Sequence, residues 1–128
     1  MRLLDTVVLV GAVNPADPHH KKALEHIDSL ASNPEVFLPS TSILEFDLEL
    51  KAHGYTAVER ETTFEDLSVK VPQGKILALS PLAMIEAVKT EAQDLGYFDS
   101  LISAQAGIAN AHVVTTDREI AKFARTVW

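Results

Sequence analysis

Short apolar runs alternate with longer helical patterns along the whole chain. The short runs are rich in Val, Ile and Leu and lie between turn residues, which is typical of buried strands. In the longer segments, apolar residues recur at the spacing that puts them on one face of a helix. The predicted strands are 2–5, 36–38, 75–79 and 112–115. Three predicted helices have both ends defined, at 18–32, 56–67 and 119–125. Three more run from Ser42 to Gly54, from Pro81 to Gly96, and from Asp99 to a point before His112.

Two segments give mixed signals. The run 7–13 is too short for periodicity to separate a strand from a helix. Residues 44–51 alternate apolar and polar positions strictly, which is a strand signal. We interpret this second segment as a helix, because Leu, Glu and Lys favour helices and Ser42–Glu45 matches a capping box.

The alternation of strands and helices predicts an α/β fold with helices on both faces of a parallel sheet. A length of 128 residues indicates one domain, residues 1–128, with one core. No internal repeat or linker interrupts the pattern.

Composition narrows the chemistry. The chain has no cysteine, which excludes disulfides, thiolate metal sites and cysteine nucleophiles, and is compatible with a cytoplasmic location. Its formal net charge of −7 is unusual for a nucleic-acid binder, unless metal ions reverse the sign of a local site. The N-terminal apolar run loosely mimics a signal peptide, but Asp5 interrupts it and it is too short to span a bilayer, so we expect no membrane segment.

Four acidic residues lie directly after predicted strands or near the starts of predicted helices. Asp5 and Asp117 follow predicted strands, so both should lie at the same edge of a parallel sheet. Glu45 and Asp99 lie near the starts of helices that should pack against that edge. Taken singly, each has a simpler explanation as a strand end, a capping residue or a partner of the helix dipole. Taken together, converging carboxylates would repel one another, and a hard divalent cation such as Mg²⁺ or Mn²⁺ would remove that penalty.

The segments LLDTVVL, ILEF, YFDSLISAQA and VVTTDREIAKF together resemble the PIN-domain family, the nuclease fold of VapC-type toxins. The resemblance covers nearly the whole chain and implies a three-layer α/β/α fold with a short central parallel sheet. Thr115 matches the hydroxyl residue that the family tends to place two positions before its last acid. Val7 departs from the family, which usually has Asn or Ser there.

The resemblance implies that Asp5, Glu45, Asp99 and Asp117 form an acidic pocket for one or two Mg²⁺ or Mn²⁺ ions. Asp5 and Asp99 would be the principal ligands, Asp117 would bind directly or through water, and Glu45 would bind or position the attacking water, with Glu49 as a lesser helper. The implied reaction is metal-assisted hydrolysis of RNA phosphodiester bonds. The implied partners are an antitoxin that blocks the acidic groove and a second copy of the chain in a homodimer.

Basic residues near the last acid are candidates for phosphate contacts. On the helix predicted at 119–125 and the residue before it, Arg118, Lys122 and Arg125 would form one stripe. Arg118 and Lys122 are therefore our candidates for binding RNA, although for the stripe taken alone a solvated helix face is the preferred explanation.

Two alternatives to a nuclease remain open. Val7 and the net acidity favour a PIN-fold RNA-binding or protein-interaction module that has weak or no catalytic activity. A phosphorylated receiver-like domain fits poorly, because it needs an adjacent acidic pair after the first strand and only Asp5 is there.

Overall fold

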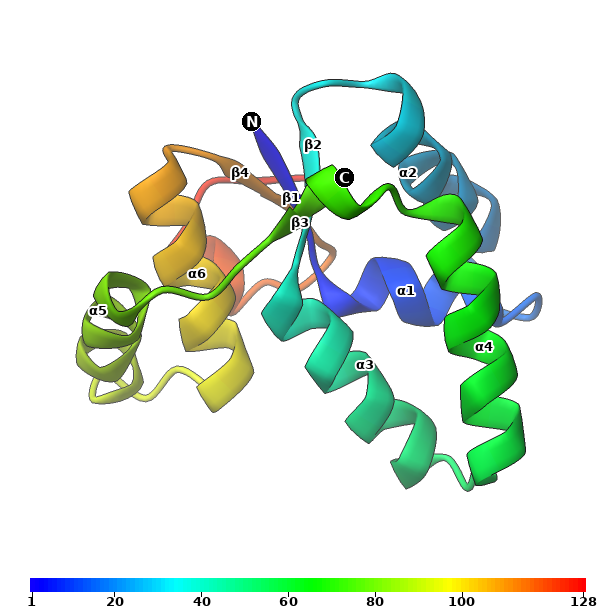
Figure 1. Ribbon diagram of the computed structural model, residues 1–128. Helices are drawn as coiled ribbons and strands as arrows, with labels where there is room; N and C mark the ends of the chain where they lie inside the picture. Colours follow the sequence, from blue (N-terminus) through cyan, green and yellow to red (C-terminus); the bar gives the residue numbers. More distant parts are fainter.

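A parallel five-stranded sheet forms the centre of the molecule, with helices on both faces (Figure 1). The computed structural model describes all residues, 1–128. It confirms the predicted three-layer α/β/α fold. The strands run in the order β3-β2-β1-β4-β5 and are β1 (Arg2–Leu4), β2 (Val36–Pro39), β3 (Ile76–Leu77), β4 (His112–Val114) and β5 (Thr126–Val127).

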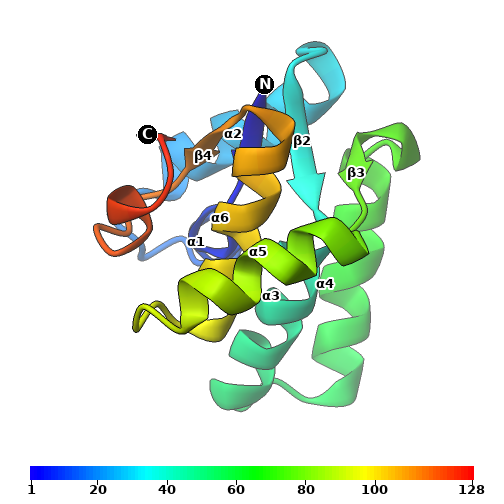
Figure 2. The same cartoon turned by 90° about the vertical axis from the view of Figure 1, so that its left-hand side faces the viewer.

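The helices divide into two groups on opposite faces of the sheet. Helices α1 to α4 share one core with the sheet, whereas α6 packs on the other face and α5 packs on α6 (Figures 1 and 2). The α-helices are α1 (Thr6–Val13), α2 (His20–Ser32), α3 (Ser40–Ala52), α4 (Ala57–Lys70), α5 (Pro81–Glu91) and α6 (Tyr97–Ala109), with short 3₁₀ turns η1 (Gln73–Lys75) and η2 (Ile120–Lys122).

Neighbouring residues of the central strands pack on opposite faces of the sheet. Leu4 and Val114 belong to the core under α1–α4, while Leu3 and Val113 belong to the core under α6. Because side chains alternate along a strand, even three-residue strands contribute to both cores. This explains why these strands appear in the sequence as continuous apolar runs.

The ambiguous run after the first strand is helix α1. Asp5 is its N-cap and accepts a hydrogen bond from the Thr6 backbone N–H. Burial decides the conformation here in spite of several β-branched residues. A Cβ on Gly11 would lie 3.1 Å from the Ala23 Cβ, so this glycine allows α1 to pack closely on α2.

Residues 44–51 belong to helix α3, as expected, but the helix starts at Ser40 and the predicted Ser42–Glu45 capping box is wrong. The Ser42 hydroxyl is buried without a partner. The apparent strand alternation arises because Leu44 and Leu48 are exposed while Phe46 is buried. In contrast, Thr56 and Glu59 form a capping box at the start of α4.

The prediction of a last helix at 119–125 is also wrong. Only the short turn η2 forms there, and the chain then pairs as β5 alongside β4. The Thr115 N–H donates to the Val127 carbonyl at 3.0 Å, so the backbone bonds of this segment are made with the sheet rather than within a helix.

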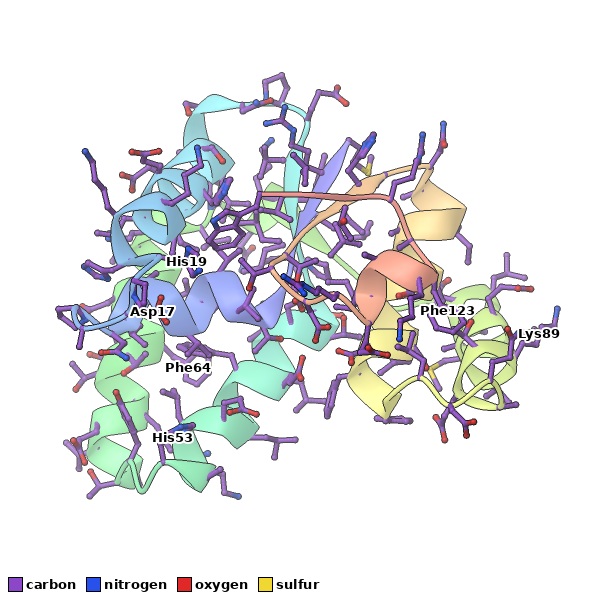
Figure 3. All side chains as sticks on the ribbon, turned by 180° about the vertical axis from the view of Figure 1, so that it is seen from behind. Asp17, His19, His53, Phe64, Lys89 and Phe123 are labelled. Atoms are coloured by element: carbon purple, nitrogen blue, oxygen red, sulfur yellow. The ribbon has the colours of Figure 1, made fainter.

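Trp128 fastens this edge strand to α2. Its ring centroid lies 5.2 Å from those of both His19 and His26, and its side chain packs against the core under α1–α4; Figure 3 labels His19 beside α1. The His20 Nδ1 lies 2.8 Å from the Gly11 carbonyl oxygen, which accepts the hydrogen bond. These histidines therefore have packing roles.

Other boundaries differ from the expectation by a few residues. Helix α2 begins at His20 rather than at Pro18, β3 spans only Ile76–Leu77, and α5 ends at Glu91. No helix has the length and apolar character that a bilayer crossing needs.

The order of the strands fixes where a ligand site can form. From β1 the chain moves through β2 to β3 with its helices on one face; it then returns to β4 with α5 and α6 on the other face. The connections leaving β1 and β4 therefore diverge. In open α/β sheets a crevice forms at such a switch point, beyond the carboxyl ends of the strands.

Candidate functional site

Asp5 stands at the switch point between β1 and β4. Its Oδ1 accepts a hydrogen bond from the Thr6 N–H at 2.7 Å, and its Oδ2 accepts one from the Thr115 hydroxyl at 2.7 Å. The residue is only 4% exposed. A carboxylate is thus held in a fixed orientation by the two diverging segments.

Thr6 holds the second acid of the site, Glu45, and this role was not predicted from the sequence. Its hydroxyl donates to Glu45 Oε2 at 2.5 Å, which joins α1 to α3. The only available signal was its position directly after the first acid. Glu45 is half-buried and faces Thr6 instead of capping its own helix.

Asp99 lies in the first turn of α6, as predicted. The residue before this helix, Gly96, is close to it: a Cβ at Gly96 would lie 3.3 Å from the Asp99 Oδ2. The missing side chain at Gly96 therefore leaves room for the Asp99 carboxylate.

Asp117 is held by the loop that follows β4. Its backbone N–H donates to the Thr115 hydroxyl oxygen at 2.9 Å, and its Oδ1 accepts from the Glu119 N–H at 2.7 Å. Thr115 thus contacts both Asp5 and Asp117 and connects the first and last acids of the set.

The acids act on one another electrostatically. Burial raises the pKa of Asp5 to about 6, with further contributions from the charges of Asp99 and Asp117. Burial also raises the pKa of Glu45 to about 7, and the charges of Asp5 and Asp99 add to the rise. The structure therefore brings together residues that are up to 112 positions apart, from Asp5 to Asp117.

Asp99 is the third acid of the site with a raised pKa. Burial raises its pKa above the usual value, and the charges of Asp117 and Glu119 contribute. No lysine or arginine is among the causes for Asp5, Glu45 or Asp99. The repulsion is therefore not offset by a cation of the chain itself.

The basic residues do not form the predicted stripe. Arg118, Lys122 and Arg125 lie on a loop, a 3₁₀ turn and the approach to β5, not on one helix. Lys122 pairs with Glu119 at 2.7 Å, and Arg125 donates to Asn110 at 2.5 Å.

The PIN-domain family model matches residues 2–126. The chain belongs to the PIN-domain family. Proteins of this family are typically nucleases. No curated protein matches the chain.

Solved structures share this PIN fold over nearly the whole length of both chains. FitAcB from Neisseria gonorrhoeae is 21% identical with a TM-score of 0.74, covering 100% of this chain and 97% of that one. A toxin–antitoxin complex from Klebsiella pneumoniae is 20% identical with a TM-score of 0.68, covering 100% and 97%. VapC20 from Mycobacterium tuberculosis, described as a sarcin-ricin loop cleaving toxin, is 12% identical with a TM-score of 0.73, covering 95% and 94%.

The donor set of this PIN domain suits a hard divalent cation. The converging side chains offer only oxygen atoms, and their raised pKa values reflect burial and mutual repulsion that a cation would relieve. However, no three His, Asp or Glu side chains of the chain lie in an arrangement that could hold a metal ion. A bound ion would therefore require the carboxylates to rotate toward one another.

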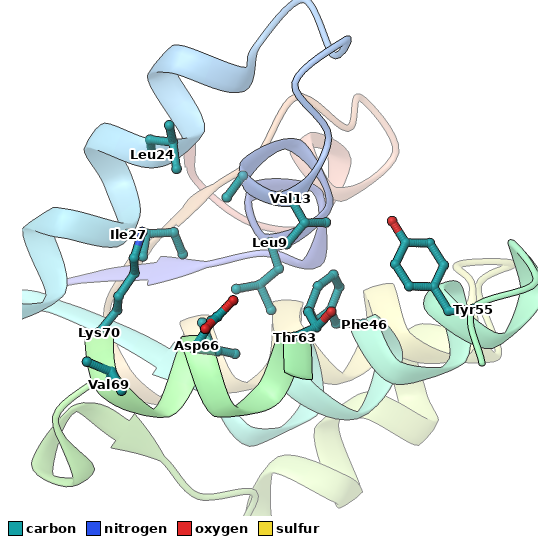
Figure 4. Close-up of a pocket in the computed structure, with 12 residues that line it drawn as sticks. Leu9, Val13, Leu24, Ile27, Phe46, Tyr55, Thr63, Asp66, Val69 and Lys70 are labelled. Carbon is teal, nitrogen blue, oxygen red and sulfur yellow. The ribbon is translucent and has the colours of Figure 1, made fainter. Parts of the chain in front are cut away.

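A mostly apolar hollow of the PIN domain lies elsewhere. It has a volume of about 490 Å³ and lies between α1, α2, α3 and α4 (Figure 4). Leu9, Ile27 and Phe46 contribute to its wall, and Asp66 and Lys70 are its charged residues. None of the four predicted site acids lines it, so it is separate from the acidic site.

Proposed function

We propose that this PIN domain is a metal-dependent ribonuclease that uses Asp5, Glu45, Asp99 and Asp117, and that it is the toxin of a toxin–antitoxin pair. The observation that carries the proposal is that the buried Asp5 and the half-buried Glu45 and Asp99 have pKa values raised by burial and by the charges of nearby acids at the sheet's switch point, without a cation of the chain to offset them. Family membership supports phosphodiester hydrolysis as the reaction.

The chain's own residues have distinct roles in this proposal. Asp5 and Asp99 would hold the ion, with Asp117 as a direct or water-mediated ligand. Mg²⁺ or Mn²⁺ would supply charge neutralisation at the phosphate and a lower pKa for a bound water. Glu45, oriented by Thr6, would accept a proton from the attacking water, because burial raises its pKa to about 7, close to neutral pH. Thr115 would hold Asp5 in place, and the exposed Arg118 and Lys122 would contact RNA phosphates.

The test is cleavage of single-stranded RNA by the purified chain with Mg²⁺, Mn²⁺ or EDTA. We expect cleavage only with a metal, and at least about a 100-fold loss in Asp5→Asn and Asp99→Asn. Asp94→Asn is the matched control, because Asp94 is exposed and has a φ of 69° that Asn tolerates. Full activity of Asp99→Asn, or activity in EDTA, would contradict the proposal.

The antitoxin partner is a proposal supported by the toxin–antitoxin complex among the solved structures. We assign the hollow between α1 and α4 to an apolar helix of this partner, because such helices bind in apolar grooves. Val69, which is 87% exposed and lines this hollow, provides the test. Val69→Asp should weaken binding of the protein encoded by an adjacent short reading frame while leaving RNA cleavage intact; unchanged binding would refute the assignment.

Self-association is the other proposed partnership. Leu44 and Leu48 of α3 and Leu82 and Ile85 of α5 are large apolar side chains that are 45–66% exposed. Such side chains at the surface favour a protein contact. Light scattering should give twice the mass of one chain, and Leu82→Glu with Ile85→Glu should return it to a monomer; a monomeric wild type would contradict the proposal.

A specific observation favours a second candidate function, an inactive interaction module. Val7 packs against the core instead of adding a polar group to the site, and the carboxylates are not assembled as ligands. This candidate predicts that Asp99→Asn binds RNA or the protein partner as the wild type does, and that neither protein cleaves RNA.

A further inference from the structure

Two hollows lie end to end along α6, and we call them together the α6 groove. The first has a volume of about 460 Å³, with Glu86 and Thr90 of α5, Ser103 and Gly107 of α6, and Phe123 in its wall. The second has a volume of about 240 Å³ and ends at Asn110 and Arg125. Both share Gly107 and Phe123, so the two hollows adjoin at these residues.

The α6 groove lies along the same helix that carries Asp99, although none of the site acids lines it. On α6, Ser103 and Gly107 follow Asp99 at intervals of four residues, which puts all three on one face. On the opposite side, Asp117 leads through η2 to Phe123. The two sides approach at the acidic end, where the charge of Asp117 contributes to the raised pKa of Asp99. They also meet at Phe123 and Gly107, about 12 Å along the helix axis from Asp99.

The wall of the first hollow offers one aromatic ring and several hydrogen-bond acceptors. Phe123 is 37% exposed and lies between η2 and α5 (Figure 3). The Thr90 hydroxyl donates to the Glu86 carbonyl, which leaves its oxygen free to accept. The Glu86 carboxylate also accepts, and it is shared only with Lys89. A Cβ at Gly107 would meet nothing within 4 Å, so the floor of the hollow is open.

Ser103 is the unusual polar residue of this wall. It is 6% exposed, and its hydroxyl oxygen is buried without a hydrogen-bond partner. Buried polar atoms normally have a partner, because leaving one unpaired is costly. A change of rotamer would turn this hydroxyl toward a ligand in the hollow.

We propose that the α6 groove receives an unpaired nucleobase of the RNA strand bound at the acidic site, stacked on Phe123. Unpaired bases commonly stack on aromatic side chains and use their edges for hydrogen bonds. The acceptors of Thr90 and Glu86 match the exocyclic amino groups of adenine and cytosine, which uracil lacks. Arg125 at the far end is positioned for a neighbouring phosphate. The proposal deepens the proposed function and rests on it for the identity of the strand.

The test uses uncharged nucleosides without metal, so that it does not depend on catalysis. Adenosine, cytidine and uridine are titrated into the full chain and followed by amide NMR. We expect shifts at Ser103, Gly107 and Phe123, and tighter binding of adenosine and cytidine than of uridine. Phe123→Ala should weaken adenosine binding at least about fivefold, and Phe123→Tyr should restore it. Val58→Ala, an exposed apolar residue on α4, is the control and should bind as the wild type does.

Each outcome separates this proposal from the nuclease proposal. Nucleoside shifts in the groove without RNA cleavage would support the base site and contradict only the nuclease. RNA cleavage with no shifts in the groove, or with equal binding by wild type and Phe123→Ala, would overturn the base site alone. Equal affinity for uridine and adenosine would remove the amino-group preference.

Discussion

At the scale of single residues, the site depends on how two hydroxyl groups hold two carboxylates. Thr115 fixes Asp5, and Thr6 fixes Glu45, each through one short hydrogen bond. Neither threonine carries charge, so they orient the acids without reducing the repulsion between them. The carboxylates are therefore ordered but electrostatically unfavourable, which is a common state for a functional site.

The close approach of Gly96 to Asp99 gives a prediction at this scale. In Gly96→Ala, the new Cβ would lie 3.3 Å from the Asp99 Oδ2, so the carboxylate must shift by a few tenths of an ångström. We expect RNA cleavage to fall roughly tenfold, because small displacements of reacting groups are costly, while stability falls by less than about 1 kcal/mol. Cleavage rates and thermal unfolding measure the two effects. Gly74→Ala is the control, since its Cβ would meet nothing within 4 Å; equal rates for both variants would contradict the prediction.

The positions of the acids in the fold follow from the sequence pattern more directly than their contacts do. Asp5 and Asp117 follow parallel strands, and parallel strands end at one edge, so their meeting follows from the pattern. Thr6 was missed because a threonine after an acid is common and its contact, Glu45, is 39 residues away. The contribution of Glu119 to the pKa of Asp99 was missed because it depends on a loop conformation that has no periodic signal.

At the scale of elements, errors arose where the pattern and the packing disagree. The exposed Leu44 and Leu48 imitate a strand within α3. The spacing of Arg118, Lys122 and Arg125 imitates a helix, yet the chain there forms a turn and an edge strand. A strand of two residues such as β5 cannot show alternation, so tertiary pairing alone defines it.

The attachment of β5 through Trp128 gives a prediction for this element. Trp128→Ala should lower stability by about 2–3 kcal/mol, because the ring is partly buried against the core and touches His19 and His26. The Val113 N–H donates to the carbonyl of Arg125, the residue before β5, and the Thr115 N–H donates to the carbonyl of Val127 in β5. Both amides should then exchange faster with solvent. Hydrogen exchange and chemical denaturation measure both effects. Trp128→Phe should preserve most of the protection, and unchanged exchange in Trp128→Ala would show that β5 is held without the ring.

At the scale of the whole molecule, the acidic site opposes folding. Asp5, Glu45 and Asp99 have pKa values above their usual range, so the folded chain binds more protons than the unfolded chain between about pH 4 and 7. Stability from these groups is therefore lost as the pH rises. The rise for Asp5 from 3.8 to about 6 corresponds to roughly 3 kcal/mol at neutral pH.

This linkage gives a third prediction. In EDTA at pH 7.5, Asp5→Asn should melt at a higher temperature than the wild type, and the difference should shrink toward pH 4.5, where Asp5 is protonated. Mn²⁺ should raise the melting temperature of the wild type more at pH 7.5 than at pH 5.5, and raise that of Asp5→Asn little. Asp28→Asn on α2 serves as an exposed control. A difference between wild type and Asp5→Asn that does not change with pH would refute the account.

The wide spacing of the site acids along the sequence also decides when the site can form during translation. Asp5, Glu45, Asp99 and Asp117 come from segments spread over most of the chain, and β5, which holds the end of β4, comes later still. A nascent polypeptide on the ribosome therefore lacks the assembled acids until translation has passed Asp117. For a proposed toxin, this order of events would keep truncated products harmless to the cell that makes them.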